Sequence, residues 1–296
     1  RGLGDVYKRQ EQQVPGLMGV KERVVGQITP AVERPHLLGN LSVRGTANST
    51  ESNQGRLWVN GLLVEGHFTV LIGNLGTLNL SDCTIFRKTG DLKVNSSGSK
   101  YTENDQLSIE IQRSILGAAI LPDSVPHLHC DHSIIQPMNG DALDAVGTHV
   151  VLNKSTITGP VNVRILEASE TIFTQPVIAK QRQVGCVRFS HIPEDSRTPR
   201  RFRCQGDLAL KNISDPNEAK KIRTYLKPIF TSDNYGDPAY MQLDLACAEE
   251  IFTGAEDGAE MGVFNFLKQA LREANLRQIL KEYLRFGLEA GIFYVT

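Results

Sequence analysis

The sequence lacks a strong excess of charge, long apolar runs and an abundance of aromatic residues. It has 32 Lys and Arg residues against 33 Asp and Glu residues, a formal net charge of -1. Nucleic-acid binding and polybasic membrane attachment both depend on excess positive charge, so we predict neither nucleic acid nor membrane as a partner. No apolar run reaches the ~18 residues that a membrane-spanning helix needs. With 40% hydrophobic and 22% charged residues, the chain nevertheless has enough apolar material for a folded core.

The sequence also lacks a disulfide pattern and the common catalytic motifs. Its five cysteines are widely spaced without a C-x-x-C pair, which favours reduced core thiols and assembly in the cytoplasm. No Gly-rich phosphate loop, Walker motif or G-x-S-x-G elbow is present. The chain starts without Met, and its opening RGLGDVYKRQ resembles a translated adaptor scar. We therefore expect residues 1–13 to be non-native or disordered and the true N-terminus to be missing.

A short pattern recurs six times between residues 57 and 173. Its first slot is aliphatic, and three small or apolar slots follow two, five and seven positions later. The first slot holds Leu57, Leu78, Ile109, Leu128, Val150 and Leu166. The second holds Val59, Leu80, Ile111, Cys130, Leu152 and Ala168. The third holds Leu62, Cys83, Ser114, Ser133, Ser155 and Thr171. The fourth holds Val64, Ile85, Leu116, Ile135, Ile157 and Phe173.

This spacing predicts short strands that wind into a solenoid. Residues two apart share one face of a strand, so slots one and two form one inward pair and slots three and four form another. The odd step between the pairs indicates a corner. A helical solenoid would need a 3.6-residue period and a leucine-rich repeat would need a recurring Asn or Cys, and neither occurs. We therefore predict a mainly β fold: a right-handed parallel β-helix over residues 14–191, with clear coils at 57–189.

Several finer features follow from the same pattern. The small polar side chains of the third slot predict an inward ladder of stacked hydroxyls near the corner, where bulky groups would clash. The polar stretch at residues 89–106 is predicted to be a loop inserted between coils. Strand-like segments at residues 23–28 and 38–43 are expected to add degraded N-terminal coils, and residues 184–189 are expected to form the last coil.

Residues 192–296 change in character and predict a mixed, helical capping region. Asp215, Pro216 and Glu218 supply an N-cap carboxylate, a Pro at the first helical position and a Glu at N3, so a helix should run to about residue 226. Residues 235–238 predict a turn, and residues 262–286 predict the strongest helix. Residues 291–296 are expected to form a terminal strand or tail. We expect this region to seal the open end of the stack or to dock another subunit.

A run of histidines near one coil suggests a metal site. His127, His129 and His132 surround Cys130, and alternate residues of a strand face the same side. However, Cys130 falls in an inward slot and points opposite to His129, while His132 follows the corner. The interpretation that we favour is a set of surface histidines, because a metal site would need ligands from neighbouring coils.

A pair of carboxylates on the outward face would indicate an enzyme that cleaves polysaccharides. The outward position between the first two slots holds Trp58, Asn79, Glu110, His129, Val151 and Glu167. Glu110 and Glu167 are three coils apart, roughly 14 Å at ~4.8 Å per strand, which is too far for a glycosidase pair. Asp141 and Asp144 lie in a predicted loop. We therefore predict no catalytic residue, no cofactor and no metal ligand; the enzymatic alternative is a polysaccharide lyase or a glycoside hydrolase.

An arginine run formed by Arg197, Arg200, Arg201 and Arg203 could contact a phosphate or an acidic polysaccharide. Because the net charge is close to zero, the interpretation that we favour is internal ion pairing. The expected partners are the acidic residues Glu249, Glu250, Glu256, Asp257 and Glu260.

Five strings carry a family resemblance: VRFS at 187–190, SRTPRR at 196–201, YGDP at 235–238, TGAEDG at 253–258 and EYLRFGL at 282–288. Over about residues 55–296, the chain resembles uncharacterised bacterial β-helix proteins encoded with phage-tail-like contractile injection systems. The resemblance implies a non-enzymatic structural or interaction protein that is a component or accessory of such a particle. It also implies a second location for the protein besides the cytoplasm, namely on a particle outside the cell. The implied partners are other subunits of the assembly, including copies of this chain. The alternative is a tailspike-like module that binds or degrades polysaccharide.

Overall fold

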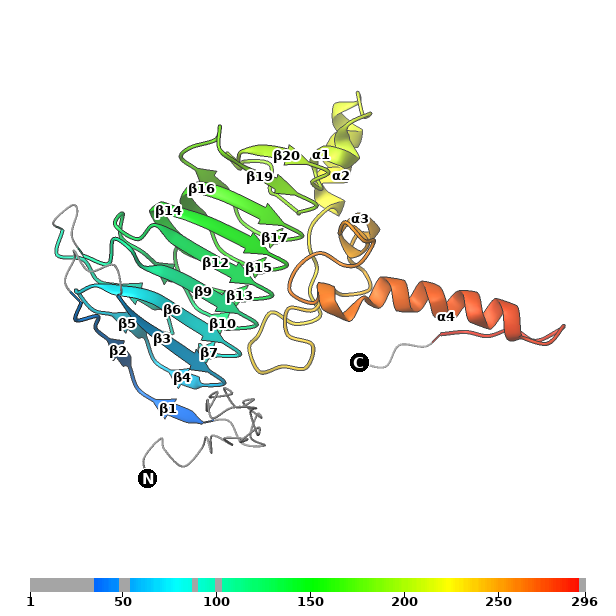
Figure 1. The fold of residues 1–296 in the computed structure, drawn as a ribbon. Helices are drawn as coiled ribbons and strands as arrows, with labels where there is room; N and C mark the ends of the chain where they lie inside the picture. Colours follow the sequence, from blue (N-terminus) through cyan, green and yellow to red (C-terminus); the bar gives the residue numbers. More distant parts are fainter. Residues whose placement is uncertain (1–34, 48–53, 87–89, 99–102, 293–296) are drawn as a thin grey trace, which may run out of the picture.

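A computed structural model describes residues 35–47, 54–86, 90–98 and 103–292 (Figure 1). The predicted scar at 1–13, the segment at 23–28 and the last four residues of the predicted tail lie outside the described residues. Within the described part, the chain is mostly β, with parallel strands in a 7-stranded and a 13-stranded sheet and few helices. Each strand pairs with the strand that occupies the same place in the preceding or following layer, and these strands form three columns.

The three strand columns are defined by their pairing. The first column contains β1 (His36–Leu38), β4 (Leu63–Glu65), β7 (Thr84–Ile85), β10 (Ile115–Leu116), β13 (Ile134–Ile135), β15 (Thr156–Ile157) and β17 (Ile172–Phe173). The second contains β2 (Leu41–Val43), β5 (Phe68–Val70), β8 (Leu92–Val94), β11 (Ala119–Ile120), the first parts of β14 (Leu143–Asn153) and β16 (Val161–Ser169), and β18 (Val177–Ala179). The third contains β3 (Gly55–Asn60), β6 (Leu75–Ser81), β9 (Ser108–Gln112), β12 (His127–Asp131), the second parts of β14 and β16, β19 (Gly185–Arg188) and β20 (Arg200–Phe202).

The inward rows predicted from the repeat are confirmed. Leu78, Ile109, Leu128 and Val150 are successive register partners in β6, β9, β12 and β14. Each is at most 1% exposed and belongs to one core cluster that runs through the stack. Because one layer alone cannot bury its inward face, each layer depends on the layers above and below it.

The sequence pattern missed the second strand column. Its strands are only two or three residues long where they stand alone, as in Ala119–Ile120, and the segments that precede them differ in length. A fixed spacing therefore cannot reveal them. Part of the predicted loop at 89–106 is in fact β8, which pairs with β5 and β11. The stack also continues beyond residue 189, because β20 adds a further strand to β19.

A left-handed residue turns the chain at each corner after the third column. These non-Gly residues have φ between 43° and 53° and are Asp82, Arg113, His132, Lys154, Glu170, Phe189 and Arg203. The residue that follows each of them points inward and forms the predicted polar ladder. The backbone N–H of Ser114 donates to Ser133 Oγ at 3.2 Å, and that of Ser133 donates to Ser155 Oγ at 3.3 Å. The ladder thus satisfies buried backbone groups that no strand partner reaches.

The described helices all belong to the C-terminal region. They are α1 (Asp207–Leu210), α2 (Pro216–Tyr225), α3 (Glu249–Phe252), the 3-10 helix η2 (Asn265–Leu267) and α4 (Gln269–Tyr283). The predicted N-cap of α2 is confirmed, since the Asp215 side chain accepts a hydrogen bond from the Asn217 N–H. The helix predicted at 262–286 is shorter, because Lys268 takes a left-handed conformation and separates η2 from α4. No described helix has the length and apolar character needed to cross a bilayer.

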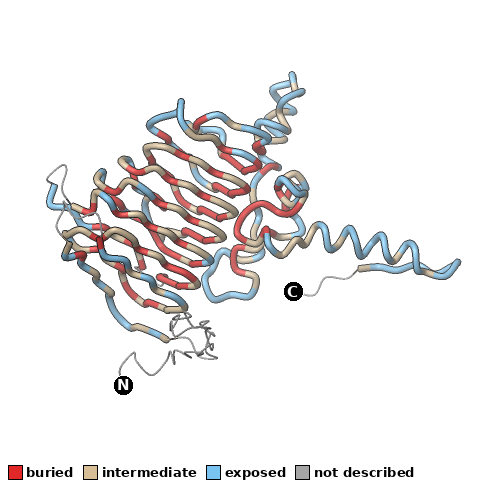
Figure 2. The backbone as a smooth tube through the Cα atoms, in the orientation of Figure 1, coloured by how far each residue is buried: buried red, intermediate tan, exposed pale blue. Residues whose placement is uncertain are grey.

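Most of the C-terminal region lies along the side of the stack rather than across its end. Figure 1 shows α1 and α2 beside β20, whereas the segment after α2 runs down past the first strand column. Ile172 of that column packs in one apolar cluster with Leu226, Ile251 and Met261. Ile134 packs in another with Val263 and neighbouring side chains. Figure 2 shows that burial extends into this segment and is lost along α4.

Candidate functional site

The outward side chains of the third strand column form a broad polar surface, which we call the outer face. The row predicted along it is confirmed by the strand register and consists of Trp58, Asn79, Glu110, His129, Val151 and Glu167, followed by Cys186. Trp58 stands out at 74% exposed. Asn79 donates to Glu110 at 2.9 Å, so neighbouring strands are joined through side chains as well as through backbone.

The histidines of the outer face take part in contacts between strands. The rings of His127 and His149 lie 5.8 Å apart, and His149 Nε2 lies 3.0 Å from Glu167 Oε1. His129 Nε2 lies 3.2 Å from Asn153 Nδ2, while Cys130 is fully buried on the opposite side of β12. Among the described residues, no three His, Cys, Asp or Glu side chains gather as a metal site would require. The geometry is that of surface histidines.

Asp131 is the carboxylate of the outer face whose ionisation is most clearly altered. Its Oδ2 lies 2.9 Å from His132 Nδ1, and this hydrogen bond lowers the pKa of Asp131 below its ordinary value. The positive charge of Lys154 acts in the same direction. Asp131 therefore stays ionised at neutral pH and can accept hydrogen bonds from a ligand hydroxyl or attract a cation.

The carboxylates considered in the sequence analysis do not form a catalytic pair. Glu110 and Glu167 belong to strands separated by β12 and β14, roughly 14 Å apart at ~4.8 Å per strand. The predicted loop is wrong for Asp144, which is part of β14 and is paired with β11 and β16. Asp141 lies outside the strand, two residues before its start, and accepts a hydrogen bond from Asn162 at 2.7 Å.

The arginine run lies at the last strand of the stack. Arg201 continues an inward row, because it is the register partner of Val187. Its guanidinium donates to Thr198 Oγ1, to the Ser196 carbonyl and to Asp207 Oδ1, at 2.8, 3.0 and 3.1 Å. An inward charge at an edge strand disfavours the addition of another strand. Arg201 thus closes the apolar core at this end.

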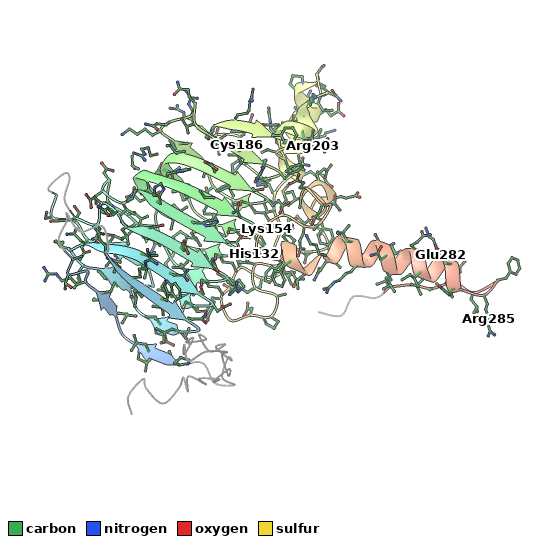
Figure 3. All side chains as sticks on the ribbon, viewed as in Figure 1. His132, Lys154, Cys186, Arg203, Glu282 and Arg285 are labelled. Carbon is green, nitrogen blue, oxygen red and sulfur yellow. The ribbon has the colours of Figure 1, made fainter. Side chains whose placement is uncertain are left out.

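The predicted pairing of this run with the acidic residues of the C-terminal region is wrong. None of the ion pairs within the described ranges joins them, because the acidic residues lie on the side of the stack and the arginines at its end. Asp257 pairs with Lys268 instead. Arg203 lies 5.8 Å from the ring centre of Phe202. Figure 3 shows Arg203 beside β20, away from His132 and Lys154.

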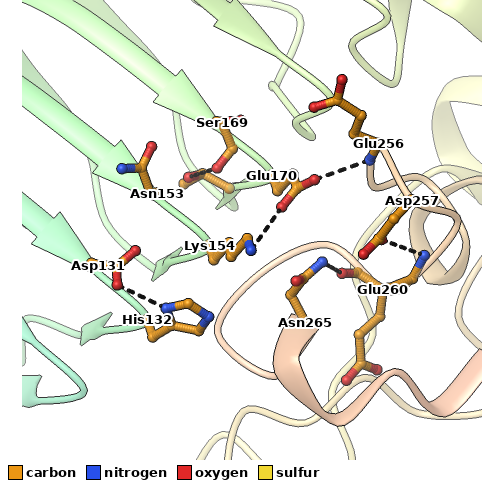
Figure 4. A network of polar contacts seen from close by, with 12 residues as sticks. Asp131, His132, Asn153, Lys154, Ser169, Glu170, Glu256, Asp257, Glu260 and Asn265 are labelled. Carbon is orange, nitrogen blue, oxygen red and sulfur yellow. Dashed lines mark hydrogen bonds and ion pairs between the residues drawn. The ribbon is translucent and has the colours of Figure 1, made fainter.

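A polar network fastens the C-terminal segment to the corner of the stack (Figure 4). Glu170, only 6% exposed, accepts a hydrogen bond from the Glu256 N–H at 3.1 Å and lies 3.7 Å from Lys154 Nζ. Its own carbonyl accepts from the Gly262 N–H at 2.8 Å. Gly262 has φ of 87°, and an added Cβ would lie 2.8 Å from Ile172 and Thr156 atoms. The close approach therefore requires glycine.

Glu260 is buried within the fastened segment without a counter-charge. It is 0% exposed, and neither carboxyl oxygen has a hydrogen-bond partner among the described residues. Burial raises the pKa of Glu260 to about 7. The next three residues carry the attachment, since the Val263 N–H also donates to Thr156 Oγ1 at 3.1 Å. A titrating carboxyl therefore lies beside the contacts that hold the segment.

Sequence reasoning missed Glu170 and the structural role of Arg201. A signal for Glu170 was present, because it precedes Thr171 of the polar ladder as Asp82 precedes Cys83 and Lys154 precedes Ser155. Every residue in that place has left-handed backbone and occupies the corner. Comparison with known proteins adds no assignment: no family model, no curated protein and no solved structure matches the chain.

Proposed function

We propose that the chain is a right-handed parallel β-helix that serves as a structural or interaction component of a phage-tail-like contractile particle. The observation that carries the proposal is the unbroken inward register from β3 to β19, which gives a rigid rod whose layers support one another. The resemblance of the C-terminal strings to β-helix proteins encoded with such particles supplies the biological setting.

The positions of those strings support an attachment role. Residues 187–190 and 196–201 surround the end closed by Arg201, and residues 235–238 and 253–258 lie in the segment fastened along the side. Residues 282–288 comprise the last two residues of α4 and the segment that follows it, where Figure 3 shows Glu282 and Arg285 distant from the stack. The strings that carry the resemblance therefore lie where the rod is closed, fastened and extended, and the outer face carries few of their residues.

A particle-association experiment tests the proposal. The tagged chain is expressed together with the genes that neighbour it, and particles are isolated on a density gradient and analysed by mass spectrometry and electron microscopy. We expect the chain to migrate with the particle at a fixed stoichiometry. Free chain at the top of the gradient beside intact particles, or neighbouring genes that encode no particle component, would contradict the assignment.

Polysaccharide binding or cleavage on the outer face is the second candidate. It is favoured by the exposed indole of Trp58 next to the hydrogen-bonding groups of Asn79 and Glu110, because an aromatic ring beside polar groups suits a sugar. A panel of acidic and neutral polysaccharides would be tested for turnover. Depolymerisation that is lost in Asp131→Asn or Glu110→Gln would favour an enzyme and defeat the passive role. Turnover unchanged in both variants would exclude this face as the catalytic site.

A further inference from the structure

Helix α4 extends from the body with no buried side chain (Figure 1). It has 15 residues, which makes it about 22 Å long. Isolated helices of this length are marginal in water, and most helical stability in proteins comes from packing. On the side of α4 that meets α3, Ala274 and Arg277 are exposed. The physical expectation is that another surface covers part of this helix.

A crevice lies where α4 passes α3. Its volume is about 460 Å³, within the range of binding pockets. The side formed by α3 and the preceding loop contributes Leu245, Cys247 and Phe252. The side formed by α4 contributes Ala270 and Ala274, together with Glu273 and its ion-pair partner Arg277. The lining therefore combines apolar side chains with charged ones, among which Glu249 adds a second carboxylate.

The face of α4 that lines the crevice is self-complementary in the antiparallel direction. Helical spacing continues this face from Ala270 and Ala274 through Arg277 to Leu280, and Leu284 is the C-cap residue that follows the helix. If a second α4 runs antiparallel with Arg277 at the centre, each small residue of the first half meets a leucine of the second half. Ala270 then lies opposite Leu284 and Ala274 opposite Leu280.

Charges follow the same symmetry. In this register Glu273 lies opposite Lys281, so each pair of helices brings two opposite-charge contacts together. Arg277 meets its own copy at the centre, but Glu273 already pairs with Arg277 at 2.8 Å within each helix and offsets that repulsion.

We propose that the occupant of this crevice is a second copy of the chain, bound through an antiparallel α4–α4 contact. The contact is isologous, because residue i of one copy meets residue j of the other while residue j meets residue i, and it closes after two copies. The chain cannot fill its own crevice in this way, since the first half of α4 forms one wall and the leucines of the second half lie further along the same helix. The dimer does not depend on the particle assignment.

The strength of the contact should be modest. A single pair of helices of this length is at the small end of specific interfaces, which typically bury ~1,200–2,000 Å². We expect a dissociation constant of about 10–100 µM, corresponding to roughly 5.5–7 kcal/mol. Local concentration on a larger assembly would then favour the dimer.

Sedimentation velocity on the full chain between about 1 and 200 µM tests this proposal. We expect a monomer–dimer equilibrium in the native chain. Ala274→Arg places a long charged side chain in the crevice and should weaken the dimer at least roughly tenfold. Asn275→Arg is the matched control, because it introduces the same side chain on a neighbouring face of α4 and should change the dissociation constant less than about twofold.

A charge exchange tests the register itself. Glu273→Lys and Lys281→Glu should each weaken the dimer, and the double variant should recover most of the loss because the opposite charges are restored. Circular dichroism checks that α4 keeps its helicity. A chain that stays monomeric at 200 µM, equal effects of Ala274→Arg and Asn275→Arg, or a double variant weaker than both single variants would overturn the proposal. None of these outcomes affects the particle-association experiment.

Discussion

In the strand columns most inward side chains are buried and those of the first layers are partly buried, whereas α4 has none that is buried (Figure 2). The two regions use their apolar residues differently. Leu128 is covered by the strands on either side of it, and its environment recurs at Ile109 and Val150. Leu276 of α4 is 44% exposed and has no repeated neighbour. Repetition creates a core in the strand columns, whereas α4 buries none of its apolar side chains in the chain itself.

The largest expected effect on the free energy of unfolding comes from shortening a leucine to alanine, and the same change is made in each of the two regions. Leu128→Ala leaves a cavity inside the stack and should lower the free energy of unfolding by about 2–5 kcal/mol. Leu276→Ala removes exposed atoms and should change it by less than about 0.5 kcal/mol. Urea unfolding followed by circular dichroism measures both. Similar losses in the two variants would show that α4 is packed as tightly as the columns.

The attachment between the regions is expected to depend on pH through Glu260. Its pKa rises from an ordinary value of 4.5 to about 7 in the folded chain, so the folded state binds more protons than the unfolded state between those values. Stability should therefore fall as the pH rises from about 4.5 to 7, by at most about 3 kcal/mol at ~1.4 kcal/mol per unit, and then level off.

Glu260→Gln separates this effect from other titrations. The amide cannot ionise, so the variant should lose the decline in that pH range and exceed the native chain in stability above pH 7. Unfolding midpoints at about pH 5 and pH 8 measure the difference between the two proteins. A decline of equal size in the variant would assign the titration to another group.

A smaller effect is expected where Glu170 holds the C-terminal segment to the corner. Glu170→Ala leaves the Glu256 N–H without its acceptor and removes the partner of Lys154, so the loss should be about 1–3 kcal/mol. Hydrogen exchange should show faster exchange at Glu256 and its neighbours, with the strand columns unchanged. Glu167→Ala, on the outer face, is the matched control and should leave that exchange as it is.

The same contrast explains how much of the molecule could be predicted from its sequence. The inward rows, the polar ladder and the outward row with Trp58 were predictable because a fixed spacing repeats at each layer. The second strand column was not, since segments of varying length precede its strands. Periodicity detects what recurs at constant intervals and misses what does not.

The C-terminal contacts had no such periodic signal. Glu170 and Gly262 are 92 residues apart and meet only because the chain returns along the first column. The arginine run was assigned to acidic partners from net charge alone, although ion pairs depend on distance. The N-cap of α2 was predictable, because Asp215 bonds only two residues ahead. Local chemistry could be read from the sequence, and long-range docking could not.

The smallest expected effect tests whether the corner ladder stabilises the layers individually. Ser133→Ala removes the acceptor of the Ser114 N–H and should lower the free energy of unfolding by about 1–2 kcal/mol, because that buried donor cannot reach water. Ser133→Cys should cost less, since Cys83 occupies the equivalent place in the ladder. Ser169→Ala on the outer face is the control and should cost less than about 0.5 kcal/mol. Equal losses at Ser133 and Ser169 would mean that the ladder adds nothing beyond ordinary surface hydrogen bonds, and that apolar burial alone holds the layers together.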